Sequence, residues 1–219
     1  MKLSLGSFLY EIVFNEKCPI CNKKSYWKVS PFCESCWSSI KPLNLNLFIK
    51  EEFSNEFWKY VDSLSCFAAY DGILKEAINI FKYQKIKRVG KLLGKLLVDI
   101  SPKELDILVP VPLHPKKLKT REFNQSAILA KEISNYRRIP LSLTILKKIK
   151  DNPPQVSLKA SERKLNVKDV YSVSRDIKNL KIGLVDDVIT TGATLAECAK
   201  VLKRAGAKEV HAITVAKTV

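Results

Sequence analysis

The chain has 219 residues, which is long enough for one sizeable domain and a smaller second unit. Its content of 46% hydrophobic and 27% charged residues is ordinary for a soluble globular protein, and no apolar run is long enough to span a membrane. The first residues lack the basic, apolar and small-residue order of a secretory signal. We therefore expect a cytoplasmic protein, with the periphery of the inner membrane as a second location.

The net charge of +16 is concentrated in the second part of the chain. Residues 1–66 contain 8 basic and 7 acidic residues, whereas residues 116–168 contain 14 basic and 4 acidic residues. A local surplus of this size favours a polyanionic partner, either a nucleic acid or a phosphorylated ligand. A solvated lysine-rich surface would give the same composition, so charge alone does not decide between these alternatives.

Four of the six cysteines form two Cys-x-x-Cys pairs separated by eleven residues. Each pair can hold a metal through two thiolates, so together they predict a tetrahedral zinc site. Four thiolates leave no open position for a substrate, so we expect a structural Zn²⁺ that stabilises a small finger. Whether the finger also contacts DNA stays open. The expected ligands are Cys18, Cys21, Cys33 and Cys36, whereas Cys66 and Cys198 lie in apolar patterns and are expected to be buried.

Residues 1–65 are expected to form an N-terminal unit, and residues 66–219 the main domain. Residues 1–14 have the periodicity of a short amphipathic helix. Between the cysteine pairs, Tyr26, Trp27 and Val29 would supply a strand of the finger. Aromatic residues in the segment 42–65, among them Phe53 and Phe57, could form a helix that packs the finger onto the main domain.

In the main domain, short apolar runs alternate with helical periodicities. This pattern predicts an α/β fold, with a mainly parallel sheet flanked by helices and ligand loops at the carboxyl ends of the strands. The expected strands cover residues 66–70, 106–111, 139–146, 171–173, 181–185 and 210–215. The expected helices cover residues 73–81, 88–100, 123–134 and 194–205, and residues 115–121 are expected to form a basic, mobile loop.

Two adjacent carboxylates, Asp186 and Asp187, follow the apolar strand over residues 181–185. The start of the next helix offers backbone N–H groups and the positive end of the helix dipole, and Gly192 lets the backbone come close to an anion. Carboxylates repel a phosphate at contact distance, so the acidic pair would serve ribose hydroxyls of the same ligand. The loop is neither a Walker loop nor a dinucleotide fingerprint, and ordinary helix capping is the alternative. The expected phosphate loop is Thr190, Thr191, Gly192, Ala193 and Thr194.

This run resembles the phosphoribosyl-pyrophosphate (PRPP) motif of type I phosphoribosyltransferases. The resemblance implies that Asp186 and Asp187 are the catalytic residues that hold the ribose 2′ and 3′ hydroxyls, and that residues 190–194 hold the 5′-phosphate. It also implies a loop that contacts the pyrophosphate after an earlier strand, with Mg²⁺ accompanying PRPP. That loop would be Val111, Pro112, Leu113 and His114. His114 is also a candidate general base, although an isolated histidine is more often a hydrogen-bonded loop residue.

Several motifs in chain order are similar to those of the ComF family, whose members join a four-cysteine finger to a phosphoribosyltransferase domain. Glu122 stands where that family usually has glycine, which leaves less backbone freedom before Phe123. The resemblance implies a role in natural transformation, handling single-stranded DNA as it enters the cytoplasm beside an ATP-dependent, helicase-like partner. The motifs, besides the acidic pair and its loop, are Pro110-Val111-Pro112-Leu113-His114, Arg121-Glu122-Phe123-Asn124-Gln125, Asp151-Asn152-Pro153-Pro154-Gln155 and Glu162-Arg163-Lys164-Leu165-Asn166-Val167.

Basic residues near the expected ligand loops are candidates for contacts with DNA phosphates. Phe123 and Tyr83 could stack on bases, with core packing as the alternative. No motif typical of sequence-specific nucleic-acid binding is present, so we expect binding without sequence preference. The basic candidates are Lys82, Lys85, Lys116, Lys117, Lys119, Arg121, Lys147, Lys148 and Lys150.

Three functions are consistent with these features. The first is binding of incoming single-stranded DNA by a competence protein. The second is a working phosphoribosyltransferase that transfers phosphoribosyl from PRPP to an unidentified acceptor. The third joins them, as a site that senses PRPP or grips a DNA 5′-phosphate without turnover. We favour a DNA-binding competence protein that retains a site for PRPP or a 5′-phosphate.

Overall fold

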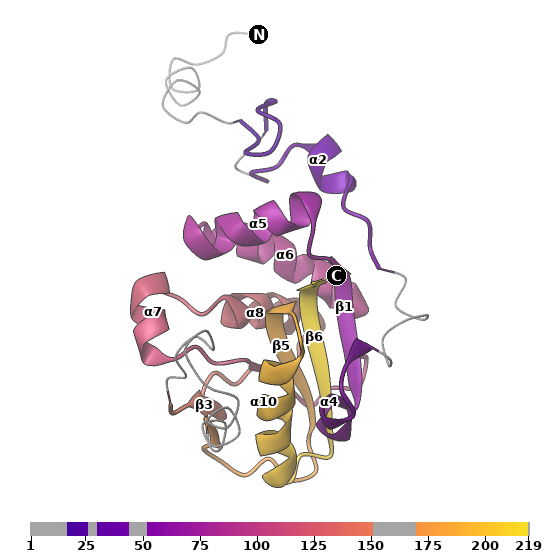
Figure 1. The fold of residues 1–219 in the computed structure, drawn as a ribbon, viewed down its shortest axis with the longest axis vertical. Coiled ribbons are helices and arrows are strands. Elements are labelled where there is room, and N and C mark those ends of the chain that lie inside the picture. Colours follow the sequence, from indigo (N-terminus) through magenta and orange to yellow (C-terminus); the bar gives the residue numbers. More distant parts are fainter. Residues whose placement is uncertain (1–16, 26–29, 44–51, 151–169, 219) are drawn as a thin grey trace, which may run out of the picture.

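The computed structural model describes residues 17–25, 30–43, 52–150 and 170–218 (Figure 1). The helix expected over residues 1–14 and the finger strand at Tyr26, Trp27 and Val29 lie outside these ranges. So do the motifs at residues 151–155 and 162–167. Every helix in the described part of the chain is too short or too polar to cross a membrane.

The main domain is built on a four-stranded sheet in the order β1-β6-β5-β2, in which all neighbouring strands are parallel. Its strands are β1 (Ser63–Ala69), β2 (Ile107–Pro110), β5 (Lys181–Ile189) and β6 (Glu209–Lys217). The expected α/β fold with a mainly parallel sheet is therefore confirmed. A separate antiparallel pair is formed by β3 (Leu146–Lys148) and β4 (Tyr171–Val173).

Helices cover both faces of the sheet, as apolar side chains on both faces of parallel strands require. One face packs against α5 (Gly72–Tyr83), α6 (Lys87–Ile100) and α8 (Gln125–Arg137). The other face packs against α10 (Ala193–Arg204), which in turn contacts the short helix α4 (Asn55–Tyr60). On β5, for example, Val185 belongs to the first core and Leu184 to the second.

Two expectations from the sequence are wrong. Residues 115–121 form helix α7 (Pro115–Arg121) rather than a loop, because Pro115 occupies the first turn and the His114 side chain caps it. Residues 139–146 do not form a continuous strand: Leu141 makes one parallel bridge with Leu108, and the ladder then stops. The hydroxyl of Ser142 accepts hydrogen bonds from the backbone N–H groups of residues 144 and 145, which turns the chain before β3 begins.

The cysteine-rich segment lies at one end of the domain, next to α5 (Figure 1). A bridge between Lys17 and Lys24 closes its first turn. The helix α2 (Glu34–Ser38) begins directly after Cys33 and contains Cys36. The chain then pairs with β1 through a bridge between Pro42 and Ala68. Cys18 and Cys36 share a core cluster with residues of α5, so the finger packs on the main domain.

Helix α4 supports the turn that begins α10. Phe57 is 1% exposed, stacks on Phe53 with ring centroids 4.7 Å apart, and meets Trp58 edge-on. A Cβ atom placed on Gly192 would lie 2.8 Å from the Phe57 ring. The aromatic residues that the sequence assigned to finger packing therefore lie under the threonine-rich loop.

We expect Phe57→Ala to lower the free energy of unfolding by about 3–5 kcal/mol, because it leaves a cavity between α4 and α10. Urea denaturation followed by circular dichroism measures this loss. The control is Leu143→Ala, at a side chain that is 61% exposed, which should change the free energy by no more than about 0.5 kcal/mol. Equal losses in the two variants would contradict the supporting role of Phe57.

Candidate phosphoribosyl site

The acidic pair lies inside β5 rather than in a loop after it, since the strand continues to Ile189. Asp186 Oδ1 accepts a hydrogen bond of 2.8 Å from the Ser126 hydroxyl and one of 2.9 Å from the Asp187 backbone N–H. Asp187 Oδ1 lies 2.9 Å from Lys82 Nζ. Each carboxylate is therefore held by a different element, α8 for one and α5 for the other.

Two adjacent carboxylates in this position repel each other and are poorly hydrated. Burial raises the pKa of Asp186 to about 7, and the charge of Asp187 acts in the same direction. The hydrogen bond from Ser126 and the Lys82 charge partly oppose this rise. The pair can therefore take up a proton close to neutral pH.

The threonine-rich loop has the geometry of an anion site. Gly192 adopts a left-handed conformation (φ 76°) directly before α10, and the Ala193 N–H donates to the Thr191 hydroxyl over 3.4 Å. Thr190, Thr191 and Thr194 are exposed. The first N–H groups of a helix have no partner within the helix, so α10 offers donors and the positive end of its dipole at this point.

The segment after β2 forms the facing wall. The Val111 N–H donates to Val185 O over 2.9 Å, which continues the pairing with β5. Asn124 ties this wall to α8, because its Nδ2 donates to Val111 O over 3.0 Å and its Oδ1 accepts from the Ser126 N–H. His114 Nδ1 accepts a hydrogen bond from the Lys116 N–H, so the His114 side chain caps the start of α7.

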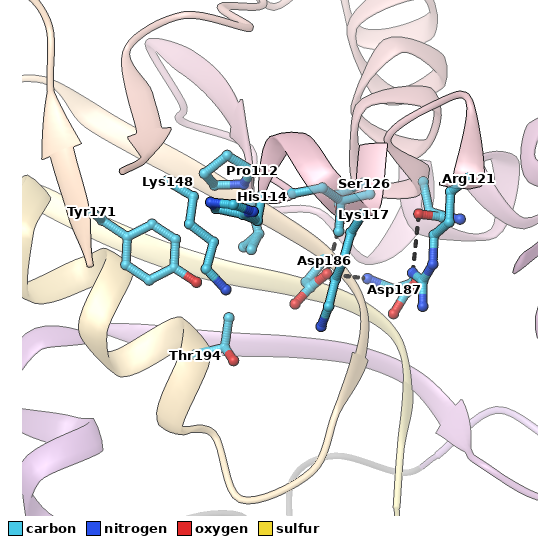
Figure 2. Close-up of a pocket in the computed structure, with 13 residues that line it drawn as sticks. Pro112, His114, Lys117, Arg121, Ser126, Lys148, Tyr171, Asp186, Asp187 and Thr194 are labelled. Atoms are coloured by element: carbon cyan, nitrogen blue, oxygen red, sulfur yellow. Dashed lines mark hydrogen bonds between the residues drawn. The ribbon is translucent and has the colours of Figure 1, made fainter. Parts of the chain in front are cut away.

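Between these walls is a cavity of about 150 Å³ whose lining is mostly polar and charged (Figure 2). It brings together residues that the sequence predicted separately: the end of β2, two basic residues of α7, Lys148 of β3, and the acidic pair with Thr194. Figure 2 shows the Lys117, Lys148 and Thr194 side chains gathered around Asp186. The predicted residues in the lining are Val111, Pro112, Leu113, His114, Lys117, Arg121, Lys148, Asp186, Asp187 and Thr194.

Three lining residues were missed by the sequence analysis: Gln125, Ser126 and Tyr171. Gln125 and Ser126 directly follow Asn124, so their place at the start of α8 was an available signal. Tyr171 lies on the short strand β4 and is buried, with Lys148 Nζ 5.8 Å from its ring centroid. Burial raises its pKa well above the usual value, so the phenol stays neutral. Only the tertiary fold brings it to the cavity.

A second, more apolar groove of about 460 Å³ adjoins this cavity and shares Pro112, Leu113 and Lys148 with it. Its lining includes the exposed side chains of Leu118 and Leu143. The groove can receive a flat apolar group of a ligand whose charged part lies in the polar cavity.

The candidate DNA-binding residues have different environments. Residues 116, 117 and 119 on α7 and residues 147 and 150 near β3 are exposed. Lys82 is 15% exposed and pairs with Asp187, and Lys85 pairs with Glu122. Phe123 is buried and stacks on Phe81 at 5.5 Å, so it belongs to the core rather than to a surface for bases. Tyr83 is 70% exposed.

Glu122 takes the left-handed conformation (φ 66°) that ends α7. Glycine adopts this conformation without strain, whereas a side chain raises its free energy by about 1–2 kcal/mol. The ion pair with Lys85, itself at φ 59°, joins the two strained positions. The chain therefore adopts here, with glutamate, a backbone conformation that favours glycine.

The four N-terminal cysteines converge: their sulfur atoms all lie within 4.8 Å of one another. None of the six cysteines forms a disulfide, and all six lie in the described part of the chain. Four thiols at this separation can hold one metal ion, and the donor set fits zinc. Cys66 and Cys198 are buried, as expected.

The family described as "Phosphoribosyl transferase domain" matches residues 124–218. The chain is 29% identical over 213 residues to competence protein F of Haemophilus influenzae, covering 91% of this chain and 90% of the relative. It is 28% identical over 159 residues to the DNA utilization protein YhgH of Escherichia coli, covering 69% and 70%. It is 24% identical over 193 residues to competence protein ComFC of Bacillus subtilis, covering 86% and 72%.

Among solved structures, the chain is similar to glutamine PRPP amidotransferase from B. subtilis, complexed with ADP and GMP. The TM-score is 0.41 and the sequence identity 28%. The match covers 56% of this chain and 25% of the amidotransferase chain.

Replacing Asp186 or Asp187 by asparagine should change the free energy of unfolding in opposite directions. Asp186→Asn is expected to raise stability by on the order of 1 kcal/mol at about pH 8, because it removes a buried charge and keeps an oxygen for Ser126. Since the folded pKa is raised, the cost of ionising Asp186 declines as pH falls through about 7 and disappears below the unfolded value. The gain should therefore be smaller at about pH 5.

Asp187→Asn should instead lower stability by about 1–3 kcal/mol, because it leaves the Lys82 ammonium without its charged partner. Thermal unfolding of both variants at the two pH values measures the contrast. Stabilisation by Asp187→Asn, or a gain from Asp186→Asn that grows as pH falls, would contradict this description of the pair.

Proposed function

Because the chain belongs to the ComF family, we propose that it is a competence protein that binds incoming single-stranded DNA in the cytoplasm and retains a site for PRPP or a 5′-phosphate. The names of its relatives, competence protein F and DNA utilization protein, support a role in the uptake or use of DNA. The observation that carries the proposal is the polar cavity, which joins an acidic pair, a helix start and several cations.

In this proposal the cavity and the adjoining loop, of which Thr194 lines the cavity, contact different parts of one ligand. The loop 190–194 and the start of α10 hold the 5′-phosphate through N–H and hydroxyl donors. When the ligand is PRPP, Asp186 and Asp187 accept hydrogen bonds from the ribose 2′ and 3′ hydroxyls. A DNA 5′ end has neither hydroxyl free, so a strand would be held at its 5′-phosphate. Lys117, Arg121 and Lys148 line the other side of the cavity and neutralise further phosphate charge.

The DNA strand would continue from this cavity along α7. Its exposed lysines, Lys116 and Lys119, would neutralise backbone phosphates. Lys147, which lines the adjoining groove, and Lys150 would add further positive charge. The adjoining apolar groove is large enough for one unpaired base, held between Leu118, Leu143 and the prolines. Such a contact is tolerant of sequence, which suits a protein that receives any strand.

A phosphoribosyltransferase is the second candidate, favoured by the same intact acidic pair and threonine loop. An acceptor would attack the anomeric carbon of PRPP while the bond to pyrophosphate breaks. The chain would act by holding the sugar on the acidic pair and the pyrophosphate beside Arg121 and Lys117. When bound with PRPP, Mg²⁺ would neutralise charge on the pyrophosphate and ribose oxygens.

A translocating, ATP-dependent helicase-like protein of the competence machinery is the protein partner that the family role suggests. The cysteine cluster would hold structural zinc in the finger next to α5. Its closed set of four thiolates supports a structural rather than a catalytic metal.

We expect labelled single-stranded DNA to bind with a steep salt dependence in fluorescence anisotropy. Lys116→Gln combined with Lys119→Gln should reduce the slope of log affinity against log salt by about 1.4, which is two single-strand phosphate contacts. The matched control removes two exposed lysines elsewhere, with Lys91→Gln and Lys131→Gln on α6 and α8. Absence of binding at moderate salt would remove the basis of the DNA proposal.

Competition between PRPP and single-stranded DNA tests whether the 5′ end of the strand binds in the polar cavity. A 5′-phosphorylated oligonucleotide should be displaced by PRPP, and the same oligonucleotide with a 5′-hydroxyl should bind more weakly. Release of pyrophosphate from PRPP only in the presence of a nucleobase would support the transferase instead.

One zinc ion per chain is expected in elemental analysis of the purified protein. Cys18→Ser with Cys36→Ser should abolish zinc binding, because two of the four thiolates are lost. Cys66→Ala is the control, as this cysteine lies in β1 and should leave the zinc content unchanged. Zinc retained in the double variant would show that the cluster is not the metal site.

A further inference from the structure

Lys82 reaches the acidic pair from a different layer of the fold. It lies in the last turn of α5, and its Nζ is 2.9 Å from Asp187 Oδ1. The side chains are only 15% and 11% exposed, so water screens this pair weakly. The nearby ion pair between Lys85 and Glu122 is 39% and 64% exposed and contributes little by comparison.

The lysine is held in place by its neighbours. Phe81, the preceding residue, is fully buried and stacks on Phe123, two residues before α8 begins. The end of α5 is therefore anchored on the same helix that supplies Ser126 to Asp186. The ammonium position is set by the core, not by a mobile surface side chain.

The negative charge of the acidic pair opposes the binding of a phosphorylated sugar. A phosphorylated sugar must approach two adjacent carboxylates, and each negative charge on the wall repels its phosphate. In many such sites a divalent cation would relieve the repulsion. Here the Lys82 ammonium already contacts Asp187 and cancels one of the two charges.

We propose that Lys82 is the resident cation of the acidic pair: it positions Asp187 to accept a ribose hydroxyl and lets the cavity bind a ribose 5-phosphate group without a divalent cation. This inference rests on the proposed phosphoribosyl site. It changes the role of Lys82 from the DNA-phosphate contact expected from the sequence to a residue that positions Asp187 in the wall of the ligand cavity.

Ribose 5-phosphate is the probe, because it carries the sugar hydroxyls and the phosphate but no pyrophosphate that would bind Mg²⁺ itself. We expect isothermal titration calorimetry to give the same affinity for the wild-type protein in EDTA and in Mg²⁺. Lys82→Met should weaken binding in EDTA by about tenfold or more, since Asp187 is left without its charged partner. Mg²⁺ should restore part of this loss, and Lys82→Arg should bind within about threefold of wild type.

Lys75→Met is the matched control, because Lys75 is an exposed lysine of the same helix. This substitution should leave the affinity for ribose 5-phosphate unchanged, both in EDTA and in Mg²⁺. Lys82→Gln gives a second variant in case Lys82→Met does not fold, and it should show the same new dependence on Mg²⁺. A purely structural role of Lys82 would lower stability without making binding depend on Mg²⁺.

The outcomes separate this inference from the proposed function. Wild-type binding that requires Mg²⁺, or Lys82 variants that bind in EDTA like wild type, would overturn the inference and leave the phosphoribosyl site standing. Failure of the wild-type protein to bind ribose 5-phosphate in either condition would overturn both.

Discussion

The main constraint on this structure is electrostatic: two adjacent carboxylates must lie at the carboxyl edge of a buried sheet, next to a helix start that favours anions. Left alone, Asp186 and Asp187 would repel each other and any phosphate nearby. Two helices reduce this repulsion: Ser126 of α8 donates a hydrogen bond to Asp186, and Lys82 of α5 forms an ion pair with Asp187. Because these helices lie on the same face of the sheet, the packing of that face fixes the charge state of the site.

The other face of the sheet fixes the shape of the loop. Gly192 needs a left-handed conformation and has the Phe57 ring directly beside it, so a side chain would meet both backbone strain and a steric clash. Helix α4 precedes the first strand in the sequence, yet it supports a turn more than 100 residues later. The site therefore depends on both cores, and damage to either one should loosen it.

The sequence predicted those parts that depend on local patterns. The apolar run before Asp186, the turn at Gly192 and the periodicity after it predicted the start of β5, the glycine turn and α10, although β5 continues past the predicted end at Val185 to Ile189. The spacing of the cysteines predicted a cluster, and the sulfur atoms do converge. In each case the residues that make the feature are neighbours in the chain or repeat with a simple period.

Features that depend on contacts between distant segments could not be predicted. Nothing near Lys82 in the sequence indicates that its partner is Asp187, and nothing near Tyr171 indicates that it lines the cavity. Phe123 was ambiguous because an aromatic residue beside lysines fits both a base-stacking surface and a core. The stack on Phe81 decides for the core. The helix at residues 115–121 is different, because Pro115 is a residue type that often begins a helix. The segment was nevertheless predicted as a loop because of its basic composition.

The arrangement of charge also constrains how a ligand can lie. The acidic pair is one wall of the cavity, whereas Lys117, Arg121 and Lys148 contribute positive charge around the rest. A ligand with hydroxyls on one side and phosphates on the other fits in a single orientation, because turning it over would place phosphates on carboxylates and leave the cations without anions. The 5′ end of a DNA strand does not match this division, because its deoxyribose lacks the 2′-hydroxyl and its 3′-oxygen is esterified. The full arrangement therefore suits a phosphoribosyl ligand, whereas the end of a strand would rely on its 5′-phosphate and on further phosphate contacts along α7.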